Sequence, residues 1–355
     1  MKLGRSLQDL AIEIERQQGA KRDFIADTRS TRTVSTKAGG LSIGIGDKEL
    51  ASVLPTALSQ LHSWAKVPHA YGKRMLDCAP EVYTEMMNHW LDKGPDNGGT
   101  GRRMFRTLDG NLRAFLSDSY RPLDNFDLCQ AVLPAIADFG CRITSCEVTD
   151  RRLYIKAVNE KVQADIKVGD AVQAGVVISN SEIGHGSLQI APMIYRLVCS
   201  NGMISQDNKL RKYHVGSKAK GEGSVWEMLE DETKETTDKA LWMQIRDVTR
   251  SALSEALFNQ QVDKMREATQ QLISDPQKVP DVVEMTVKKY GLSEEDNRGV
   301  LGHLISGGDL SRYGLLNAVT RYSQDVEDYD KATELEELGG KILDLNAKEW
   351  AQLVG

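Results

Sequence analysis

Alternation of apolar and polar residues between positions 142 and 199 is the feature that most constrains how this chain folds. Successive side chains of a β-strand point to opposite faces, so a period of two residues predicts strands with one buried face. Strands that follow one another over short turns pair antiparallel, so we expect a meander. The predicted strands lie at 142–148, 153–158, 162–166, 175–179 and 187–199.

The second of these strands shows how the two faces differ. Its apolar residues alternate with Arg152, Tyr154 and Lys156, which place two cations around an aromatic ring on the opposite face. The third strand alternates apolar residues with lysines and other polar residues in the same way. We therefore expect one face of the sheet to be buried and the other to be solvated and mostly basic.

A hairpin and a helix precede the meander. Asp109-Gly110 separates two alternating runs, and this dipeptide favours a two-residue hairpin turn. Asp124 or Asn125 can then cap a helix, which Pro134 should kink or divide. The order hairpin, helix, meander predicts an α+β layer in which a helix covers one side of an antiparallel sheet.

Helical spacing dominates on both sides of the sheet region. Apolar residues recur at intervals of three and four from 49 to 91, which predicts two or three helices before a glycine-rich break at 94–101. Beyond residue 221 the same spacing predicts a short helix that starts near Trp226, a long helix from 236 to 273 and shorter helices before an acidic end. The first 46 residues contain one short amphipathic segment and several glycines, which indicates a loosely attached arm.

These patterns predict an α+β protein with a central antiparallel sheet, flanked by N-terminal and C-terminal helical regions. The 355 residues suffice for a sizeable buried core. We divide the chain into an N-terminal arm, a helical region with a glycine-rich linker, an α+β sheet domain, a C-terminal helical region and an acidic segment. Their boundaries are 1–46, 47–101, 102–220, 221–321 and 322–355.

Composition excludes several classes of protein. With 40% hydrophobic and 27% charged residues, the chain is neither disordered nor a membrane protein. No run approaches the roughly 20 apolar residues that span a bilayer. The N-terminus is too polar for a secretory signal peptide, so we expect a cytoplasmic protein. Five widely spaced cysteines match neither a disulfide framework nor a zinc site, so we expect reduced thiols.

The net charge of −6 is unevenly distributed along the chain. Residues 322–355 contain nine acidic residues and three lysines and so account for all of it. Residues 196–220 contain six basic residues and one aspartate, a local charge of +5. The chain is therefore polarised, with a basic middle and an acidic end, although solvated surfaces alone would also explain both clusters.

No nucleotide-binding loop, histidine pair with metal-ligand spacing or nucleophile elbow occurs in the sequence. We therefore expect no cofactor, no metal and no enzymatic activity. The most distinctive polar segment is 179–186, where two glycines and His185 interrupt a strand. It predicts either a plain hairpin turn or a backbone approach to a ligand. Metal ligation by Glu182, Asp165 and Asp170 is a further hypothesis.

A basic surface is the stronger functional signal, because recognition of a nucleic-acid backbone needs cations and aromatic rings but no catalytic group. Such residues decorate the predicted hairpin, the second strand and the segment after the last strand. The alternative is that these cations keep the sheet soluble and protect its edges. The candidate DNA-binding residues are Arg102, Arg103, Arg106, Arg113, Arg152, Tyr154, Lys156, Lys209, Arg211, Lys212, Lys218 and Lys220.

Four motifs stand out along the chain: Tyr120-Arg-Pro-Leu-Asp-Asn125, Val177-Ile-Ser-Asn-Ser-Glu-Ile-Gly-His-Gly186, Tyr195-Arg-Leu-Val-Cys-Ser-Asn-Gly202 and Tyr313-Gly-Leu-Leu-Asn-Ala-Val-Thr320. Their residues and their order resemble the phage/plasmid-like protein family built on domain of unknown function 932. This resemblance implies no established enzymatic activity. It implies an origin in phages, plasmids or mobile elements, close to replication and recombination genes.

The order hairpin, helix, meander is also similar to the core of single-strand annealing proteins of the Rad52 type. That resemblance implies rings or filaments of identical subunits that hold DNA in a basic outer groove and need no ATP. It further implies that the acidic end resembles the protein-recruiting tails of single-strand-binding proteins.

We therefore predict a homo-oligomer that binds single-stranded DNA and anneals strands without ATP in phage or plasmid recombination. The expected partners are single-stranded DNA and a protein that binds the acidic end. The alternative is a non-enzymatic interaction or regulatory module of a mobile element, which would bind a host protein through the acidic end or segment 179–186. A metal-dependent nucleic-acid enzyme is the third hypothesis, with Glu182 and Asp165 as its first candidates.

Overall fold

The centre of the molecule is a six-stranded antiparallel sheet, as the alternating pattern predicts. The computed structural model describes residues 1–36, 40–46, 51–94, 101–206, 210–212 and 231–355, and of 210–212 only the backbone. The strand order is β11-β10-β9-β8-β7, and β12 also pairs with β10. These strands are β7 (Arg142–Val148), β8 (Leu153–Lys167), β9 (Asp170–Asn180), β10 (Leu188–Arg196), β11 (Asn201–Ile204) and β12 (Leu210–Lys212).

Two of the predicted strands are one continuous strand. β8 joins the segments 153–158 and 162–166, with a register shift against β9 between Asn159 and Gln163. The chain then turns at Val168-Gly169, where Gly169 has a φ of 80°, and enters β9. The prediction missed this turn, since a single glycine among charged residues is a weak turn signal.

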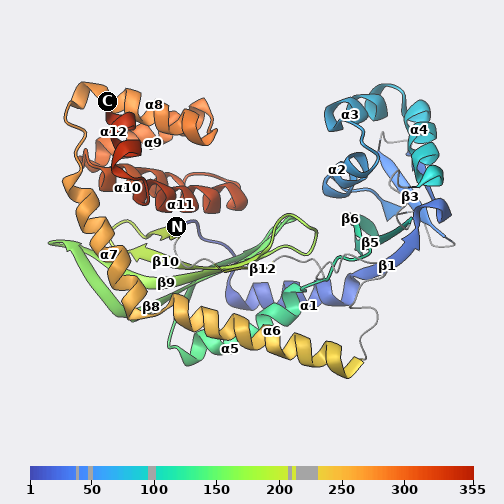
Figure 1. The fold of residues 1–355 in the computed structure, drawn as a ribbon, viewed down its shortest axis with the longest axis horizontal. Coiled ribbons are helices and arrows are strands. Elements are labelled where there is room, and N and C mark those ends of the chain that lie inside the picture. The colour runs from blue at the N-terminus through green and yellow to red at the C-terminus, as the bar shows by residue number, and fades with distance from the viewer. Residues whose placement is uncertain (37–39, 47–50, 95–100, 207–209, 213–230) are drawn as a thin grey trace.

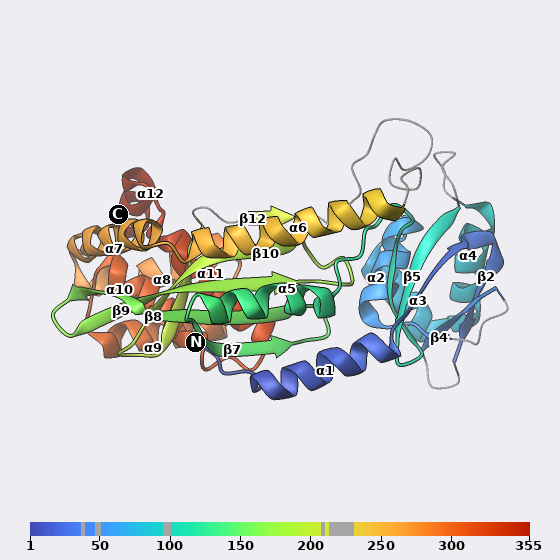
Figure 2. The same cartoon turned by 90° about the horizontal axis from the view of Figure 1, so that it is seen from below.

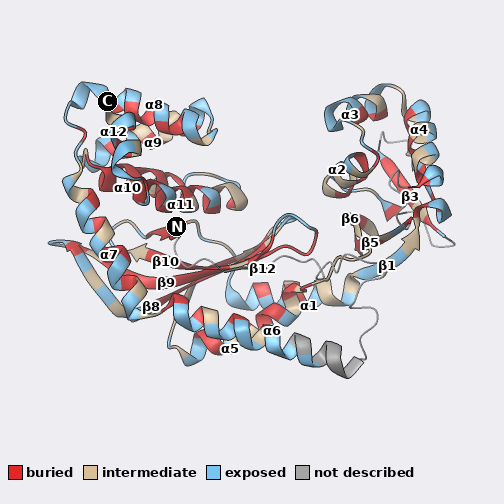
Figure 3. Ribbon diagram, in the orientation of Figure 1, coloured by how far each residue is buried: buried red, intermediate tan, exposed pale blue. Residues whose placement is uncertain are grey.

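Helices cover both faces of the sheet (Figures 1 and 2). On one face, α1 (Leu7–Ala20), α5 (Asn125–Asp138) and α6 (Asp231–Ala252) share a core with the strands. α7 (Glu255–Gln270) packs against β8 and β10. On the other face lie α10 (Arg312–Tyr322) and α11 (Tyr329–Leu343), and α8 (Val279–Tyr290), α9 (Glu294–Gly307) and α12 (Ala347–Val354) pack with them. Most of β9 and β10 and the first half of β8 are therefore buried from both sides, whereas the second half of β8 is largely exposed (Figure 3).

A second lobe, the N-terminal lobe, contains two small antiparallel sheets. One has the order β1-β5-β6 and the other β2-β3-β4, and three helices pack beside them. The prediction of two or three helices in this region is confirmed. The strands are β1 (Arg22–Asp27), β2 (Thr31–Ser35), β3 (Leu41–Ile45), β4 (Ala51–Ser52), β5 (Arg102–Leu108) and β6 (Asn111–Ser117), and the helices are α2 (Pro55–Trp64), α3 (His69–Cys78) and α4 (Pro80–Lys93).

The N-terminal segment is not a loosely attached arm, so that prediction is wrong. Leu10 and Ile14 of α1 are buried against the central sheet. β1 then pairs with β5 from Arg22 to Asp27. The first residues thus belong to both lobes, because the amphipathic face of α1 needs the sheet as its cover.

The predicted hairpin is confirmed, but its place is not. Asp109 and Gly110 have φ values of 52° and 75°, as a type I′ turn requires. β5 of the hairpin pairs with β1 in the N-terminal lobe, so the hairpin belongs to that lobe and not to the meander. Only the partner strand, which lies about 80 residues earlier in the sequence, decides this assignment.

The helical predictions hold with three changes. α5 runs unbroken through Pro134, and the predicted long helix is two helices, α6 and α7, separated at Leu253-Ser254. The acidic end is not an extended tail, because it folds into α11 and α12. The predicted short helix near Trp226 lies outside the described residues. None of the helices within the described ranges is long and apolar enough to cross a membrane.

Candidate functional site

The sheet face that we expected to be solvated is covered by the acidic end of the chain. Lys156 is fully buried beneath α11, and its Nζ lies 2.6 Å from Oε2 of Glu336, whose side chain is also fully buried. The same Nζ donates to Oγ1 of Thr333 at 3.1 Å. The prediction of a basic surface is therefore wrong at Lys156, because α11 supplies both an apolar cover and the countercharge.

Tyr154 is also removed from the surface. Its side chain is 4% exposed, and its ring centroid lies 5.3 Å from that of Tyr329. Its hydroxyl donates to Asp330 at 2.8 Å, and burial, together with this carboxylate, raises the pKa of Tyr154. A ring enclosed between β8 and α11 offers no face to a nucleobase, so the prediction that Tyr154 stacks on DNA is wrong.

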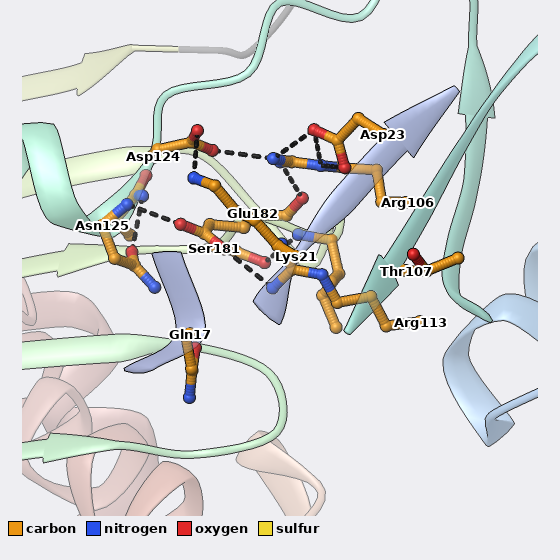
Figure 4. A network of polar contacts seen from close by, with 12 residues as sticks. Gln17, Lys21, Asp23, Arg106, Thr107, Arg113, Asp124, Asn125, Ser181 and Glu182 are labelled. Carbon is orange, nitrogen blue, oxygen red and sulfur yellow. Dashed lines mark hydrogen bonds and ion pairs between the residues drawn. The ribbon is translucent and has the colours of Figure 1, made fainter. Parts of the chain in front are cut away.

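Arg106 lies at the junction between the N-terminal lobe and the central sheet (Figure 4). Its guanidinium is fully buried, and its Nη2 lies 2.8 Å from Asp23 and 2.7 Å from Asp124. Its Nη1 donates to the carbonyl of Glu182 at 2.7 Å, and Lys21 forms a second ion pair with Asp124. Arg106 thereby joins β1, β5, the start of α5 and the loop after β9. It is not available to a phosphate.

Arg113 enters the same junction from β6. Its Nη1 lies 2.7 Å from Oε2 of Glu182, and Oε1 of Glu182 accepts the backbone N–H of Asn125 at 2.6 Å. Both charged side chains are buried. The prediction that Arg106 and Arg113 lie on the surface of the hairpin is wrong, because this side of the hairpin packs against the loop after β9. We call these residues, with Lys21, Asp23 and Asp124, the lobe junction.

The carboxylates considered as metal ligands do not meet. Glu182 belongs to the lobe junction at one end of the sheet, where Asn180 pairs with Leu153. Asp165 lies twelve residues further along β8, roughly 40 Å away. Asp170 accepts two hydrogen bonds from Arg196. Among the residues that the structure describes, no three His, Cys, Asp or Glu side chains cluster in a way that could hold a metal ion.

Two of the four motifs build the lobe junction. Asp124 and Asn125 end the first motif, whereas Asn180 and Glu182 belong to the second. Nδ2 of Asn180 donates to the carbonyl of Leu123 at 2.7 Å and to Oδ1 of Asn125 at 2.8 Å. These buried amides fix the start of α5 to the end of β9.

The other two motifs meet at the opposite end of the sheet. Asp170 accepts hydrogen bonds from Arg196 and, at 2.9 Å, from the hydroxyl of Tyr313. Nδ2 of Asn201 donates to Oγ1 of Thr320 at 2.6 Å. All four motifs therefore contain side chains that hold helices against the sheet.

A polar hollow of about 190 Å³ opens beside α11. Residues of α11 at helical spacing form one wall, and the opposite wall comes from the turn between β7 and β8 and from the loop between β9 and β10. We refer to this site as the hollow. Its lining residues are Arg151, Arg152, Tyr154, His185, Gln189, Asp330, Thr333, Glu334 and Glu337.

The loop between β9 and β10 is held against the hollow by Arg152. Nε and Nη2 of Arg152 donate to the carbonyl of His185 at 3.0 and 2.6 Å. Gly186 has a φ of 122°, and a Cβ there would lie 1.9 Å from Nη2 of Arg152, so only glycine permits this approach. Nε2 of His185 lies 3.2 Å from Oγ1 of Thr56 in the N-terminal lobe. The predicted connection between two strands is confirmed here, and its binding of a ligand stays a prediction.

Several groups in the hollow lack a partner among the residues that the structure describes. Arg151 and Glu334 form no side-chain hydrogen bond or ion pair with a described residue, and Oε1 of Gln189 is buried without a partner. Burial, Asp330 and Glu337 raise the pKa of Glu334. Arg151, Gln189 and Glu334 were not among the predicted residues. The spacing of the acidic residues at 330, 334 and 337 would have placed them on one helix face.

The remaining predicted residues are divided between two places. Arg102 is exposed and Arg103 is half-buried, both on β5 of the N-terminal lobe. The backbone of Arg211 in β12 pairs with that of Gln189, next to the hollow. Arg152 and the segment that contains Arg211 and Lys212 therefore lie at the same end of the sheet. Outside the described residues lie Lys209, Lys218 and Lys220.

Comparison with known proteins yields one match. The family model described as domain of unknown function (DUF932) matches residues 114–337, which is more than half of the chain and contains all four motifs. Neither a curated protein nor a solved structure matches the chain. The chain therefore belongs to the family defined by the domain of unknown function DUF932.

Proposed function

We propose that this protein binds single-stranded DNA in the cytoplasm and promotes ATP-independent strand annealing, as a homo-oligomer, in phage or plasmid recombination. One observation supports the site of binding. Arg151 and Arg152 line the hollow at the end of the sheet where β12 brings the backbone of Arg211 and Lys212 beside β10. Cations that lie close together can neutralise successive phosphates of a flexible strand.

The two arginines differ in their availability. Arg151 is exposed and has no carboxylate partner among the described residues, so a phosphate need not displace an existing ion pair. Arg152 uses Nε and Nη2 for the carbonyl of His185, and its Nη1 makes no bond to a described residue. The proposed DNA-binding residues therefore lie at the turn between β7 and β8, and not on the face of β8 that α11 covers.

The test measures the affinity for a labelled single-stranded oligonucleotide, and the rate at which two complementary oligonucleotides anneal, at low and high salt without ATP. We expect Arg151→Glu combined with Arg152→Glu to weaken binding and to reduce the salt slope by about 1.4, since two phosphate contacts are lost. The matched control is Lys239→Glu combined with Arg246→Glu. Both residues are exposed on α6, on the opposite side of the sheet.

The single variant Arg151→Glu controls for a folding defect, because the Arg151 side chain forms no hydrogen bond or ion pair with a described residue. An unchanged affinity and an unchanged salt slope in both variants would exclude this surface. Failure of the wild-type protein to bind single-stranded DNA at low salt would exclude the proposed function itself.

The mixed charge of the hollow favours a second candidate function. Asp330 and Glu334 face Arg151 and Arg152 across the site, and such a surface also complements a protein segment that carries both charges. A non-enzymatic interaction module would form a stable complex with a protein of the mobile element or its host. It would show no salt-sensitive binding to DNA.

A further inference from the structure

We propose that the hollow receives one base of the bound strand and selects bases that carry an exocyclic amino group. This inference rests on the proposed function and deepens it, because it assigns the hollow to a base and the neighbouring arginines to the backbone. It predicts that the protein prefers cytosine to thymine at this position.

The size of the hollow suits a single ring system. Its volume of about 190 Å³ lies below the roughly 300 Å³ at which pockets begin to hold drug-sized ligands. A cavity of about 150 Å³ is sufficient for benzene. One heterocycle therefore fits, whereas the sugar and phosphate of the same nucleotide must remain outside.

The charges of the two walls orient the nucleotide. Arg151 and Arg152 stand on the side of the β7–β8 turn, while Asp330 and Glu334 stand on α11. Phosphates are repelled by carboxylates, so the backbone must pass along the arginines and the base must point towards α11. This arrangement gives the acidic wall a role that a phosphate-binding surface alone does not explain.

The groups without a protein partner determine which base fits. An ionised Glu334 is a hydrogen-bond acceptor and not a donor, and the buried Oε1 of Gln189 is an acceptor that no described residue supplies with a donor. The amino group of cytosine donates to such acceptors, as it does to glutamate in DNA recognition. Thymine presents a carbonyl oxygen in place of the amino group, so two acceptors would face each other.

The experiment compares oligo(dC) with oligo(dT) of equal length at neutral pH. Both are pyrimidine strands with the same number of phosphates, so the ratio of their dissociation constants isolates the base. We expect the wild-type protein to bind oligo(dC) about tenfold more tightly, the effect of one well-placed base contact. We expect Glu334→Ala and Gln189→Met each to bring the ratio close to one.

The control is Glu327→Ala, an exposed acidic residue just before α11 that does not line the hollow. It should keep the tenfold ratio. Equal affinity of the wild-type protein for the two strands would overturn this inference and leave DNA binding intact, as would a ratio that survives in both hollow variants. Binding of neither strand at low salt would instead overturn the proposed function.

Discussion

The sheet face beneath α11 and the hollow at its edge contain the same types of charged residue. They differ in whether these charged groups are buried and paired or accessible to solvent. Beneath α11, Lys156 and Glu336 are fully buried and bonded to each other. In the hollow, Arg151 and Glu334 are accessible and have no partner among the described residues. Thr333 belongs to both regions, because it accepts from Lys156 and also lines the hollow.

This difference shows that a basic pattern on a strand does not by itself identify a binding surface. Four of the predicted DNA-binding residues, Arg106, Arg113, Tyr154 and Lys156, are structural. Each forms an ion pair or hydrogen bond with a carboxylate from another element, namely Asp23, Asp124, Glu182, Asp330 or Glu336. Function is better sought where charges remain without an internal partner.

The largest expected effect on stability comes from breaking the buried ion pair of Lys156 and Glu336. Lys156→Met leaves Glu336 buried without a countercharge, and we expect a loss of about 3–5 kcal/mol in the free energy of unfolding. Urea denaturation monitored by circular dichroism measures it. Combining this change with Glu336→Leu removes both charges and should recover most of the loss. If the double variant is no more stable than the single variant, the pair does not account for the effect.

A smaller effect is expected at the lobe junction, and it depends on pH. Burial alone would raise the pKa of Asp124, but Arg106 and Lys21 outweigh burial and lower it. A carboxylate with a lowered folded pKa stabilises the protein above its unfolded pKa of about 3.9, and this contribution disappears as the pH falls through the folded value. Asp124→Asn should therefore cost about 2 kcal/mol at pH 7.

The difference in unfolding free energy between wild type and Asp124→Asn should begin to shrink below about pH 4, where Asp124 of the unfolded chain takes up a proton, and should disappear once the pH falls below the lowered pKa of Asp124 in the folded protein. Urea titrations at several pH values provide the measurement. A difference that stays constant down to pH 3 would show that the amide substitution acts through packing and not through the lost charge.

The smallest effect on stability is expected in the hollow. Arg151→Ala should change the free energy of unfolding by no more than about 0.5 kcal/mol, because this exposed side chain holds nothing in place. Arg142→Ala serves as the comparison. Its ion pair with Glu160 has the same 2.6 Å separation as the buried pair of Lys156 but is half exposed. A large loss of unfolding free energy in Arg151→Ala would contradict the distinction between the sheet face beneath α11 and the hollow.

Local patterns predicted most elements of the fold. The period of two residues placed β7 to β10, Asp109-Gly110 placed the hairpin turn, and helical spacing placed α2 to α5 and α8 to α10. The predictions that failed are those that depend on which distant residues pack against each other. Nothing near Arg106 in the sequence shows that Asp23 and Asp124 will surround it, and nothing near Lys156 indicates Glu336, which lies 180 residues away.

The sequence by itself therefore determined the fold class, the order of hairpin, helix and meander, the motifs of the family and the uneven distribution of charge. These depend on interactions between residues close in the chain, whose spacing the sequence records directly. Only the tertiary structure decided which charges are buried and which remain available. Burial of a charge depends on the element that packs over it, and α11 reaches the face of β8 from the far end of the chain.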